Sequence, residues 1–383
     1  MGGVFVQEQA AVLRAQGVEV TLISPVAYAP KVLHMNPKWK ALGAVPFEEQ
    51  EVTSRVYHPH MLLPPRQWLF KYTGKFYEIA VKRAFKKLGI SNPSNNFDLI
   101  HAHVALPDGD AARRLAKIWG IPYVVTIHGQ DFYDTIKRSP GEKNVVAQVL
   151  KEASKVIMVS TKLREIAERE TLPGLEKTVI VPNGVSLNKI YRGISPLAKH
   201  YEGKTVLLSV GNLIPRKAHD YVLQALRKLV KKYPSLHYII VGEGQEREYL
   251  KQQAINSGLE NHVDFVGRVE HAKVFEYMSF CDIFALPSWA EAFGVVYIEA
   301  MAHGKPVIGC YGEGVEDIVE ENITGKLVPQ KNAEALIDRI SELMDSVYRQ
   351  QIGEAGRKVV ETKFTWDSNA QHMLDIYRQI VSE

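Results

Sequence analysis

The sequence predicts an α/β protein with two domains, each a parallel sheet covered by helices, and three observations lead to this fold class. The chain has 383 residues, which exceeds what one compact core normally holds and favours two or three domains. Short apolar runs typical of buried strands alternate with longer amphipathic runs typical of helices. The alternation pauses over a polar segment, 188–203, and then resumes. We therefore expect one domain over 1–192 and a second over 203–365, with a ligand cleft between them.

The first domain is expected to begin with a helix over 4–16, which Gly17 ends, followed by a strand over 18–23. A parallel α/β sheet usually begins instead with a strand that leads into a glycine-rich turn. Gly2 and Gly3 resemble such a turn without its strand, so we expect the natural protein to begin upstream of the first residue. The remaining elements expected in this domain are strands over 98–101, 123–127, 156–159 and 179–181 and a helix over 110–119.

The second domain shows the same alternation. Its expected strands are 206–210, 238–241, 263–266, 283–286, 307–308 and 326–328. Its expected helices are 218–232, 245–257, 294–303 and 332–346, and a last helix over 366–383 is expected to pack back on the first domain. Because parallel strands present their carboxyl ends at one edge of a sheet, ligand-binding residues are expected in the loops that follow these strands.

The composition is that of an ordinary soluble globular protein and excludes several function classes. Hydrophobic residues make up 46% and charged residues 23% of the chain. The 47 Lys and Arg against 43 Asp and Glu leave a net charge of only +4, too small to indicate a nucleic-acid partner. The two cysteines, Cys281 and Cys310, form neither a disulfide framework nor a zinc set. No apolar run of membrane-spanning length and no signal peptide is recognised, so we expect a cytoplasmic protein.

Basic and aromatic residues gather over 66–87. The solvated face of an amphipathic helix is one interpretation of this pattern. Peripheral contact with the inner face of the cell membrane is the alternative hypothesis, because basic and aromatic side chains suit an anionic lipid surface.

The most informative segment is 291–299, EAFGVVYIE, which follows an apolar run closed by Pro287. That order predicts a buried strand, a short loop and a helix that begins near Gly294. Glu291 would lie at the carboxyl end of the strand, N–H groups near Gly294 would suit a phosphate, and Glu299 would lie about two turns into the helix. This spacing fits a nucleotide-sugar, although the two Glu side chains could also offset a helix dipole or face solvent.

A glycine and two cations follow the first strand of the second domain. Gly211 has no side chain to shield the backbone there. Arg216 and Lys217 place two positive charges at the carboxyl end of the strand. Both can neutralise a diphosphate, the guanidinium through two parallel hydrogen bonds and the ammonium as a point charge. A solvated basic turn is the alternative interpretation.

A histidine ends one strand of the first domain. His128 could donate a hydrogen bond to a sugar hydroxyl or act as a base, and it could equally be a structural residue. His103 and Asp131 are further candidates, expected on the acceptor side. His101 and His103 share a strand face, as a pair of metal ligands would. No carboxylate or thiolate partner for them is evident, so no metal is expected.

Three short motifs admit both a functional and a structural interpretation. The triplet DGD at 108–110 resembles the acidic triplet of metal-dependent sugar transferases, but it directly precedes a helix, where carboxylates cap N–H groups. The GEG turns at 242–244 and 312–314 do not complete a dinucleotide-binding motif, because Arg247 and Asp317 stand in place of the third glycine. Helix capping is therefore favoured for the triplet, and a nicotinamide-dependent dehydrogenase is disfavoured.

With these residues placed, the chain resembles glycosyltransferase family 4 over nearly its whole length. These are retaining enzymes of the GT-B fold, in which two Rossmann-like domains face a central cleft. Gly2 and Gly3 correspond to the family's donor-facing glycine loop, and PNGV at 182–185 to a turn before the linker. His128 matches the active-site histidine that hydrogen-bonds the transferred sugar. These motifs are specific in combination and weak one by one.

The resemblance assigns roles to residues of both domains. It implies His128 and Glu291 as the catalytic residues, with Glu291 near the sugar. It places Lys217 at the diphosphate, Glu299 on the ribose and the pair 268–269 along the base. The donor-binding residues that it implies are Gly2, Gly3, Asn212, Arg216, Lys217, Arg268, Val269, Phe293, Gly294, Val295 and Glu299.

The chain departs from the family pattern at two positions near the diphosphate. Many members have an arginine where this chain has Asn212, and an amide cannot supply that charge. We hypothesise that Arg216 supplies it instead. Ala218 stands where glycine is usual.

The function that the resemblance implies is retaining transfer of a sugar from a nucleoside-diphosphate sugar, expected to be UDP-linked. The expected acceptor is a glycan or a lipid-linked glycan, in the synthesis of bacterial cell-surface polysaccharide. Neither a metal nor another cofactor is expected, because cations and a helix N-terminus can offset the charge of the leaving group. The alternatives are a nucleotide-sugar epimerase or phosphorylase on the same fold and a catalytically idle sugar-binding subunit.

Overall fold

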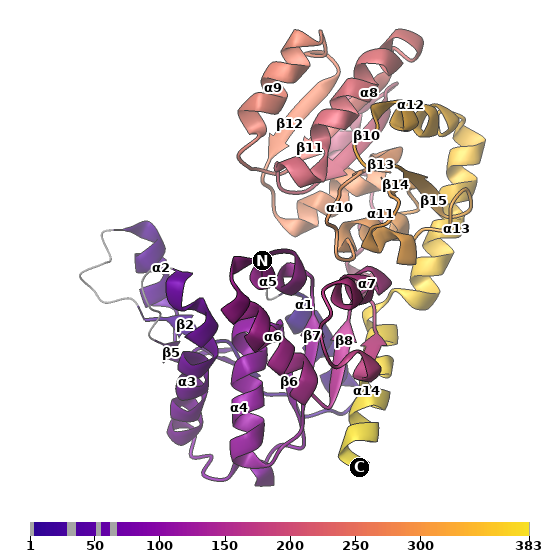
Figure 1. Ribbon diagram of the computed structural model, residues 1–383. Coiled ribbons are helices and arrows are strands. Elements are labelled where there is room, and N and C mark those ends of the chain that lie inside the picture. Colours follow the sequence, from indigo (N-terminus) through magenta and orange to yellow (C-terminus); the bar gives the residue numbers. More distant parts are fainter. Residues whose placement is uncertain (1–3, 29–35, 51–54, 62–66, 383) are drawn as a thin grey trace. The chain divides into compact units, whose positions relative to one another are not determined.

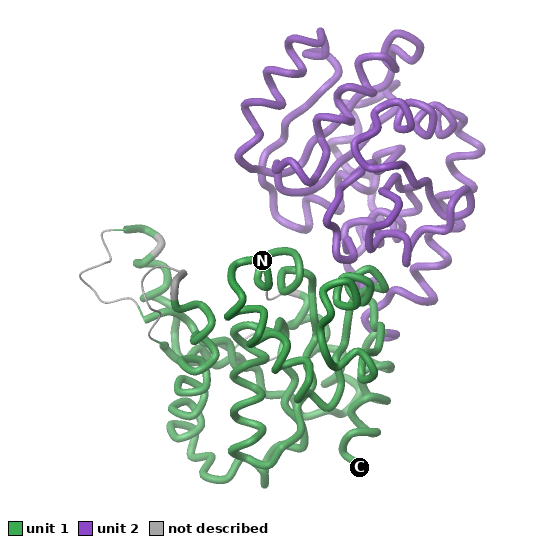
Figure 2. The backbone as a smooth tube through the Cα atoms, in the orientation of Figure 1, with its two compact units in different colours: residues 1–182, 369–383 green, residues 183–368 purple. Residues whose placement is uncertain are grey.

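The chain forms two compact units in the computed structural model (Figure 2). The structure describes residues 4–28, 36–50, 55–61 and 67–382. Unit 1 consists of Met1–Pro182 and Asn369–Glu383, and unit 2 of Asn183–Ser368. The chain therefore passes between the units twice, once after Pro182 and once within its last helix.

The polar segment that the sequence suggests as a linker, 188–203, belongs to unit 2. The Tyr201 hydroxyl donates a hydrogen bond of 2.8 Å to Asp264 Oδ2, and the Tyr191 N–H donates one of 3.3 Å to His303 Nε2. These contacts hold the segment on unit 2. Hydrophobic periodicity cannot reveal them, because they join isolated polar groups that lie far apart in the sequence.

Unit 1 combines short strands from the start of the chain with a larger parallel sheet and its helices (Figure 1). Its strands are β1 (Leu22–Ile23), β2 (Val26–Ala27), β3 (Glu48–Gln50), β4 (Arg55–Tyr57), β5 (His60–Met61), β6 (Ile100–His103), β7 (Tyr123–Ile127), β8 (Lys155–Met158) and β9 (Thr178–Ile180). Its helices are α1 (Val4–Ala15), α2 (Pro37–Ala44), α3 (Thr73–Lys87), α4 (Asp110–Trp119), α5 (Ile136–Arg138), α6 (Pro140–Glu152) and α7 (Thr161–Arg169). Helix α14 (Trp366–Ser382) begins in unit 2 and ends in unit 1.

The larger sheet of unit 1 has the strand order β6-β7-β8-β9, and each neighbouring pair is parallel. All residues of β7 are buried, which accounts for the continuous apolar run in its sequence. His103, the last residue of β6, pairs with Thr126 near the end of β7. The carboxyl ends of these two strands therefore lie side by side, and the residues that follow them share one edge of the sheet.

The strand expected over 18–23 is much shorter in the structure. Only Leu22 and Ile23 pair with another strand, in the separate three-stranded sheet β1-β4-β3. The residues before them are held by α1 instead, because the Val18 N–H donates to the Leu13 carbonyl at 3.1 Å. The apolar character of this stretch reflects packing beside α1 rather than membership of the larger sheet.

The final turns of α14 pack on unit 1. Met373, Leu374 and Ile380 share one buried cluster with Val124 of β7 and Ile157 of β8. The apolar face of an amphipathic helix is stabilised by such burial, at about 25 cal/mol for each Å² of apolar surface removed from water. The C-terminal segment is therefore part of the core of unit 1.

Unit 2 is a six-stranded parallel sheet with helices packed against it (Figure 1). Its strands are β10 (Thr205–Val210), β11 (Leu236–Val241), β12 (Val263–Gly267), β13 (Ile283–Ala285), β14 (Val307–Cys310) and β15 (Gly325–Val328). Its helices are α8 (His219–Lys232), α9 (Arg247–Asn256), α10 (His271–Phe280), α11 (Val295–Ala302), α12 (Ala333–Glu342) and α13 (Ser346–Lys363).

The strand order in unit 2 is β12-β11-β10-β13-β14-β15. The chain builds the sheet outwards from β10 in one direction and then returns to add β13 on its other side. Such a reversal is a topological switch point, and open α/β sheets bind ligands outside the carboxyl ends of the two strands that flank it. The loops after β10 and β13 are therefore the expected site.

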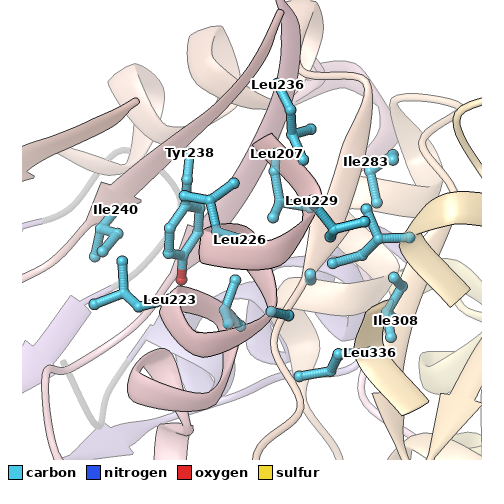
Figure 3. Close-up of a cluster of buried hydrophobic side chains, with 14 of the residues drawn as sticks. Leu207, Leu223, Leu226, Leu229, Leu236, Tyr238, Ile240, Ile283, Ile308 and Leu336 are labelled. Carbon is cyan, nitrogen blue, oxygen red and sulfur yellow. The ribbon is translucent and has the colours of Figure 1, made fainter. Parts of the chain in front are cut away.

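The core of unit 2 joins its sheet to α8 and α12. Leucine and isoleucine side chains from the strands and both helices point toward one another around the ring of Tyr238 (Figure 3). The Tyr238 hydroxyl does not lie unpaired in this core, because it meets Ser209 Oγ at 2.7 Å. Satisfying that group inside the cluster avoids the cost of burying an unpaired polar atom.

Helix α13 is the longest element that the sequence does not predict. Gly353 and Gly356 interrupt its pattern, and glycine normally disfavours a helix interior. In the structure a side chain at Gly353 would place its Cβ 2.0 Å from the carbonyl oxygen of Gly304, and one at Gly356 would meet the carbonyl of Thr324 at 3.0 Å. The two glycines let α13 approach the neighbouring backbone closely, so they serve packing and do not end the helix.

Candidate active site

The unit 2 site lies where the loops after β10 and β13 meet. Lys217 ends the short turn after β10, and Glu291 lies in the loop between β13 and α11. The Lys217 ammonium donates a hydrogen bond of 2.5 Å to Glu291 Oε2, with the two side chains 17% and 14% exposed. The Trp289 N–H also donates to the Arg216 carbonyl at 2.9 Å. The structure thus brings two residues of the predicted site together as one ion pair at the switch point.

Glu291 is held in place by groups from its own loop and from the loop after β14. Ser288 Oγ donates to Glu291 Oε2 at 3.0 Å, and the Glu291 N–H donates to Glu313 Oε2 at 2.9 Å. The Gly314 N–H donates to the Glu291 carbonyl at 3.0 Å. A Cβ at Gly314 would lie 2.1 Å from the Ala292 carbonyl oxygen, so only glycine allows this approach. Such support fixes the carboxylate before a ligand binds.

Helix α11 begins where the sequence places a phosphate. Gly294 is its N-cap, with φ of 86° and ψ of 66°, a left-handed conformation that glycine adopts readily. The N-cap residue is a glycine and has no side chain to form a capping bond, so the N–H groups from Val295 onward form the N-terminal end that suits an anion. Phe293 is only 2% exposed and packs on Phe364 at 6.1 Å between ring centroids. Its side chain is therefore structural, and only its backbone can face a ligand.

Glu299 is not the solvent-facing helix residue of the alternative interpretation, since it is only 8% exposed. Its Oε1 accepts a hydrogen bond of 2.7 Å from His271 Nε2. His271 is the first residue of α10 and comes shortly after β12. The sequence gives one weak signal for this histidine, its place just after the pair 268–269.

The remaining predicted donor residues lie in loops at the same edge of the sheet. Asn212 is exposed directly after β10, and Arg216 is partly exposed in the turn that contains Lys217. Arg268 is exposed and Val269 partly exposed after β12. Ala218 has φ of 58° and ψ of 27°, a left-handed conformation that explains why a glycine suits this position better. Gly2 and Gly3 lie outside the described residues.

Three histidines gather at the carboxyl ends of β6 and β7 in unit 1. His103 Nδ1 and His128 Nε2 lie 3.0 Å apart, and the His101 and His103 rings stack with centroids 4.3 Å apart. His101 also meets the Tyr377 hydroxyl at 2.5 Å and Thr126 Oγ1 at 2.7 Å. The structure therefore joins His128 to His103, while His101 links the sheet to α14.

Burial keeps these imidazoles neutral. It lowers the pKa of His101 to about 3 and that of His128 to about 4. Burial also lowers the pKa of His103 well below its usual value, and His101 and His128 add to that effect. Each ring then carries one N–H donor and one acceptor nitrogen at neutral pH, which suits a hydroxyl group better than an anion.

Two acids of unit 1, Asp131 and Asp108, have raised pKa values. Asp131 is 1% exposed, its Oδ1 accepts the Ala105 N–H at 2.5 Å, and its Oδ2 has no hydrogen-bond partner among the described residues. Burial raises the pKa of Asp131 to about 6. Burial and the charge of Asp131 raise the pKa of Asp108 to about 7, although a hydrogen bond from Tyr77 partly offsets them. Both carboxyls therefore exchange protons near neutrality.

The DGD triplet does not cap α4 as the sequence favours. Asp110 is fully buried and forms ion pairs with Arg113 at 2.8 Å and Arg114 at 2.9 Å. The N-cap of α4 is Gly109, without a side-chain capping bond. A carboxylate this deeply buried needs two cations more than it needs helix N–H groups.

Within the described ranges no three His, Cys, Asp or Glu residues are arranged to hold a metal ion.

Glu313 is a second supporting residue that the sequence does not identify. It is 4% exposed, and it accepts the Glu291 N–H on one oxygen and the Gln330 side-chain amide, at 2.6 Å, on the other. In the sequence it stands in an incomplete dinucleotide-binding turn. Its role depends on loops that meet only in the folded sheet.

Comparison with known proteins follows the same division of the chain. A model of Glycosyltransferase Family 4 matches residues 2–189, and a model of Glycosyl transferases group 1 matches residues 195–359. The phosphatidyl-myo-inositol mannosyltransferase of Mycobacterium leprae is 26% identical over 100% of this chain and 94% of that protein. Sucrose-phosphate synthase from Thermosynechococcus elongatus has a TM-score of 0.82 at 24% identity, over 100% of this chain and 94% of its own. HepE from Anabaena, in complex with UDP-glucose, has a TM-score of 0.73 at 20% identity, over 98% and 95%.

Two α/β units with parallel sheets and these structural neighbours define the GT-B fold. The protein is a glycosyltransferase that uses a nucleotide-sugar donor. The chain belongs to glycosyltransferase family 4. The fold class and the enzyme class expected from the sequence are thereby confirmed.

Proposed function

We propose that the protein is a retaining hexosyltransferase that moves a sugar from a UDP-linked donor to a glycan or lipid-linked acceptor in bacterial cell-surface polysaccharide synthesis. The observation that carries the proposal is the Lys217–Glu291 pair at the switch point of unit 2. It places a cation and an acid at the carboxyl ends of the two strands where such sheets bind nucleotides. The named activity of the Mycobacterium leprae relative and the UDP-glucose bound to HepE support a lipid-linked acceptor and a UDP-linked donor.

The donor would lie along unit 2 with its charges matched in order. Lys217 and Arg216 meet the diphosphate, and the N–H groups at the start of α11 add a second donor set without a metal. Glu299 accepts hydrogen bonds from the ribose, and the loop 268–269 lines the base. Glu291 lies between Lys217 and the start of α11, near the transferred sugar.

The reaction proceeds on one face of the sugar. The bond from C1 to the diphosphate oxygen breaks, and its electron pair leaves with the diphosphate. The acceptor hydroxyl forms the new bond to C1, and its proton passes to the leaving phosphate oxygen, so no protein base is consumed. Lys217 and the α11 N-terminus stabilise the charge that develops on the phosphate. Glu291 and His128 orient the sugar.

Unit 1 presents neutral groups to the sugar and the acceptor. His128, kept neutral by burial, can donate or accept one hydrogen bond to a sugar hydroxyl. Asp131 has an oxygen without a hydrogen-bond partner in the described part of the chain, and we assign it and His103 to the acceptor side. Neutral hydroxyls are the chemistry that these groups fit.

A peripheral membrane contact would bring a lipid-linked acceptor to the enzyme. No helix in the described part of the chain has the length and apolarity needed to span a bilayer. Helix α3 and the turn before it nevertheless expose apolar and basic side chains together. These are Leu69, Tyr72, Lys75, Ile79, Lys82, Arg83 and Lys86. Such a face suits the anionic inner surface of a cell membrane.

Vesicle binding tests the membrane contact. Exchanging Lys75 and Lys86 together for Glu should weaken sedimentation with phosphatidylglycerol vesicles at low salt, while the same exchange at Lys231 and Lys232 on α8 serves as the control. Equal binding by both double variants would support a merely solvated helix face.

Ligand-dependent stabilisation tests the proposed donor. A thermal-shift series with UDP, GDP, ADP and their sugars should raise the unfolding temperature most for a UDP compound, because a ligand that binds only the folded state stabilises it by mass action. Product analysis with the best donor and a range of acceptors should then give a glycoside with retained configuration. An epimer or a sugar phosphate as the sole product would favour the alternative enzymes, and no stabilisation by any nucleotide would overturn the proposal.

A further inference from the structure

The carboxylate of Glu299 accepts a hydrogen bond from His271, a histidine that belongs to none of the sequence motifs. Glu299 is 8% exposed, and its Oε1 accepts the hydrogen bond from His271 Nε2 at 2.7 Å. The imidazole itself is 54% exposed. A buried carboxylate and an exposed ring therefore meet at the border of the donor region, between the loop after β12 and helix α11.

The backbone of Glu299 is held by a second histidine. His303 Nδ1 lies 2.7 Å from the Glu299 carbonyl oxygen, and its Nε2 accepts the Tyr191 N–H at 3.3 Å. A carbonyl can only accept and an amide N–H can only donate, so these contacts set the neutral tautomer with the proton on Nδ1. Burial lowers the pKa of His303 to about 4, which keeps it in that form.

The two histidines are joined through one aromatic ring. Phe275 lies 4.5 Å from the His271 ring and 5.3 Å from the His303 ring between centroids. The backbone of Glu299 is thus anchored by His303, its carboxylate by His271, and the two anchors share a rigid packing partner. What His271 adds to this arrangement is the orientation of one carboxylate oxygen.

We propose that His271 is a positioning residue for donor binding, which turns the Glu299 carboxylate so that its second oxygen meets the ribose hydroxyls of the nucleotide. The inference rests on the proposed function, because it takes Glu299 as the ribose contact. A carboxylate with one oxygen already bonded loses less rotational freedom when a diol binds. His271 does not touch the reacting atoms, so its effect belongs to donor affinity and not to turnover.

Two substitutions separate the hydrogen bond from the packing. His271→Leu keeps an apolar group against Phe275 but removes the donor, whereas His271→Gln retains an N–H donor at nearly the same distance from the backbone. Because the ring is more than half exposed, neither change is expected to unfold the protein, and the unfolding temperature without ligand checks this. The probe is UDP, measured by isothermal titration.

His271→Leu should raise the Kd for UDP about three- to tenfold, the size expected when one hydrogen bond with a half-exposed partner is lost. His271→Gln should recover most of that loss, and kcat at saturating donor should change little in either variant. In a Glu299→Gln background, His271→Leu should have almost no further effect, because the group it orients no longer carries charge.

An equal loss in the Glu299→Gln background would overturn the inference, because His271 would then act independently of Glu299. An unchanged Kd in His271→Leu would overturn it as well. Both results leave the proposed function standing as long as the unsubstituted protein binds UDP. Failure of the unsubstituted protein to bind UDP would instead overturn the proposed donor, and the inference with it.

Discussion

The two units place opposite kinds of polar chemistry at the carboxyl ends of their parallel sheets. Unit 2 pairs a cation with an acid at Lys217 and Glu291, and an imidazole with an acid at His271 and Glu299. Unit 1 gathers histidines whose pKa values burial lowers, and acids whose pKa values burial raises. The fold class is shared, but unit 2 joins its acids to Lys217 and His271, whereas burial shifts the pKa values of the histidines and acids of unit 1.

This difference matches the two halves of a glycosyl transfer. A nucleoside diphosphate carries charge that must be offset, so the cation at Lys217 and the helix N-terminus of unit 2 suit it. Sugar and acceptor hydroxyls are neutral, so the imidazoles of unit 1, which burial keeps neutral, suit them better.

Among the unit 2 residues, Lys217 is expected to contribute most to catalysis. Lys217→Ala should lower kcat/KM about 1000-fold, because the charge on the leaving phosphate loses its nearest cation and Glu291 loses its partner. Steady-state kinetics with the identified donor measure this, and Lys231→Ala on the exposed face of α8 is the matched control. A loss smaller than tenfold would mean that Lys217 is a structural residue.

Among the unit 1 residues, His128 is expected to contribute most to turnover. His128→Ala should lower kcat roughly 100-fold, within the range for removing a positioned proton donor or acceptor, while the Kd for UDP stays nearly constant. His60→Asn, at an exposed site of unit 1, is the control for unspecific effects. A large rise in the UDP Kd with unchanged kcat would break the contrast, since His128 would then serve the nucleotide.

Substitution of Arg216 tests whether its guanidinium supplies the positive charge that Asn212 cannot supply. Arg216→Ala should raise the Kd for UDP about tenfold, because a guanidinium at a diphosphate contributes two charge-assisted hydrogen bonds. Arg227→Ala, exposed on α8, provides the comparison. If donor affinity and turnover stay untouched by the change at Arg216, the compensation hypothesis is wrong.

The raised pKa of Asp108 in unit 1 should also affect how the stability of the protein depends on pH. Burial raises the pKa of Asp108 to about 7 from its ordinary value of 3.8. Between these values the folded protein holds a proton that the unfolded chain has released, so this group makes stability fall as pH rises toward 7. Asp108→Asn removes that loss, and it should raise the unfolding temperature by a few degrees more at pH 8 than at pH 5. Parallel shifts at both pH values would show that Asp108 is ionised in the fold.

Apolar runs make most of unit 2 predictable from the sequence, and contacts between distant loops explain most of what is missed. Most strands of this unit are buried, although the edge strand β12 is only partly so, and each reads as a short apolar segment near its observed bounds. The sequence indicates separate roles for Lys217 and Glu291, one at the diphosphate and one near the sugar. It does not predict their ion pair, because the loops that carry them meet only through the strand order of the folded sheet.

Other features have no signal in sequence periodicity. His271 and Glu313 act through partners on other loops, and their positions look like ordinary turn and helix-start residues. No helix is expected from the sequence between 346 and 366, where the structure has α13, whose Gly353 and Gly356 pack closely on neighbouring backbone. Asp110 looks like a helix cap, and only burial shows that it needs Arg113 and Arg114. Each error arises where tertiary contact overrides a local preference.

Glu291 and Glu299 have different roles within the segment 291–299 if donor Kd and kcat, measured side by side, respond differently to Glu291→Ala and Glu299→Ala. Glu299→Ala should raise the Kd for the donor about tenfold with kcat nearly unchanged, because it removes ribose contacts. Glu291→Ala should lower kcat roughly 100-fold with little change in Kd, because it orients the reacting sugar. Equal effects of the two substitutions on donor affinity alone, with turnover intact, would contradict the account.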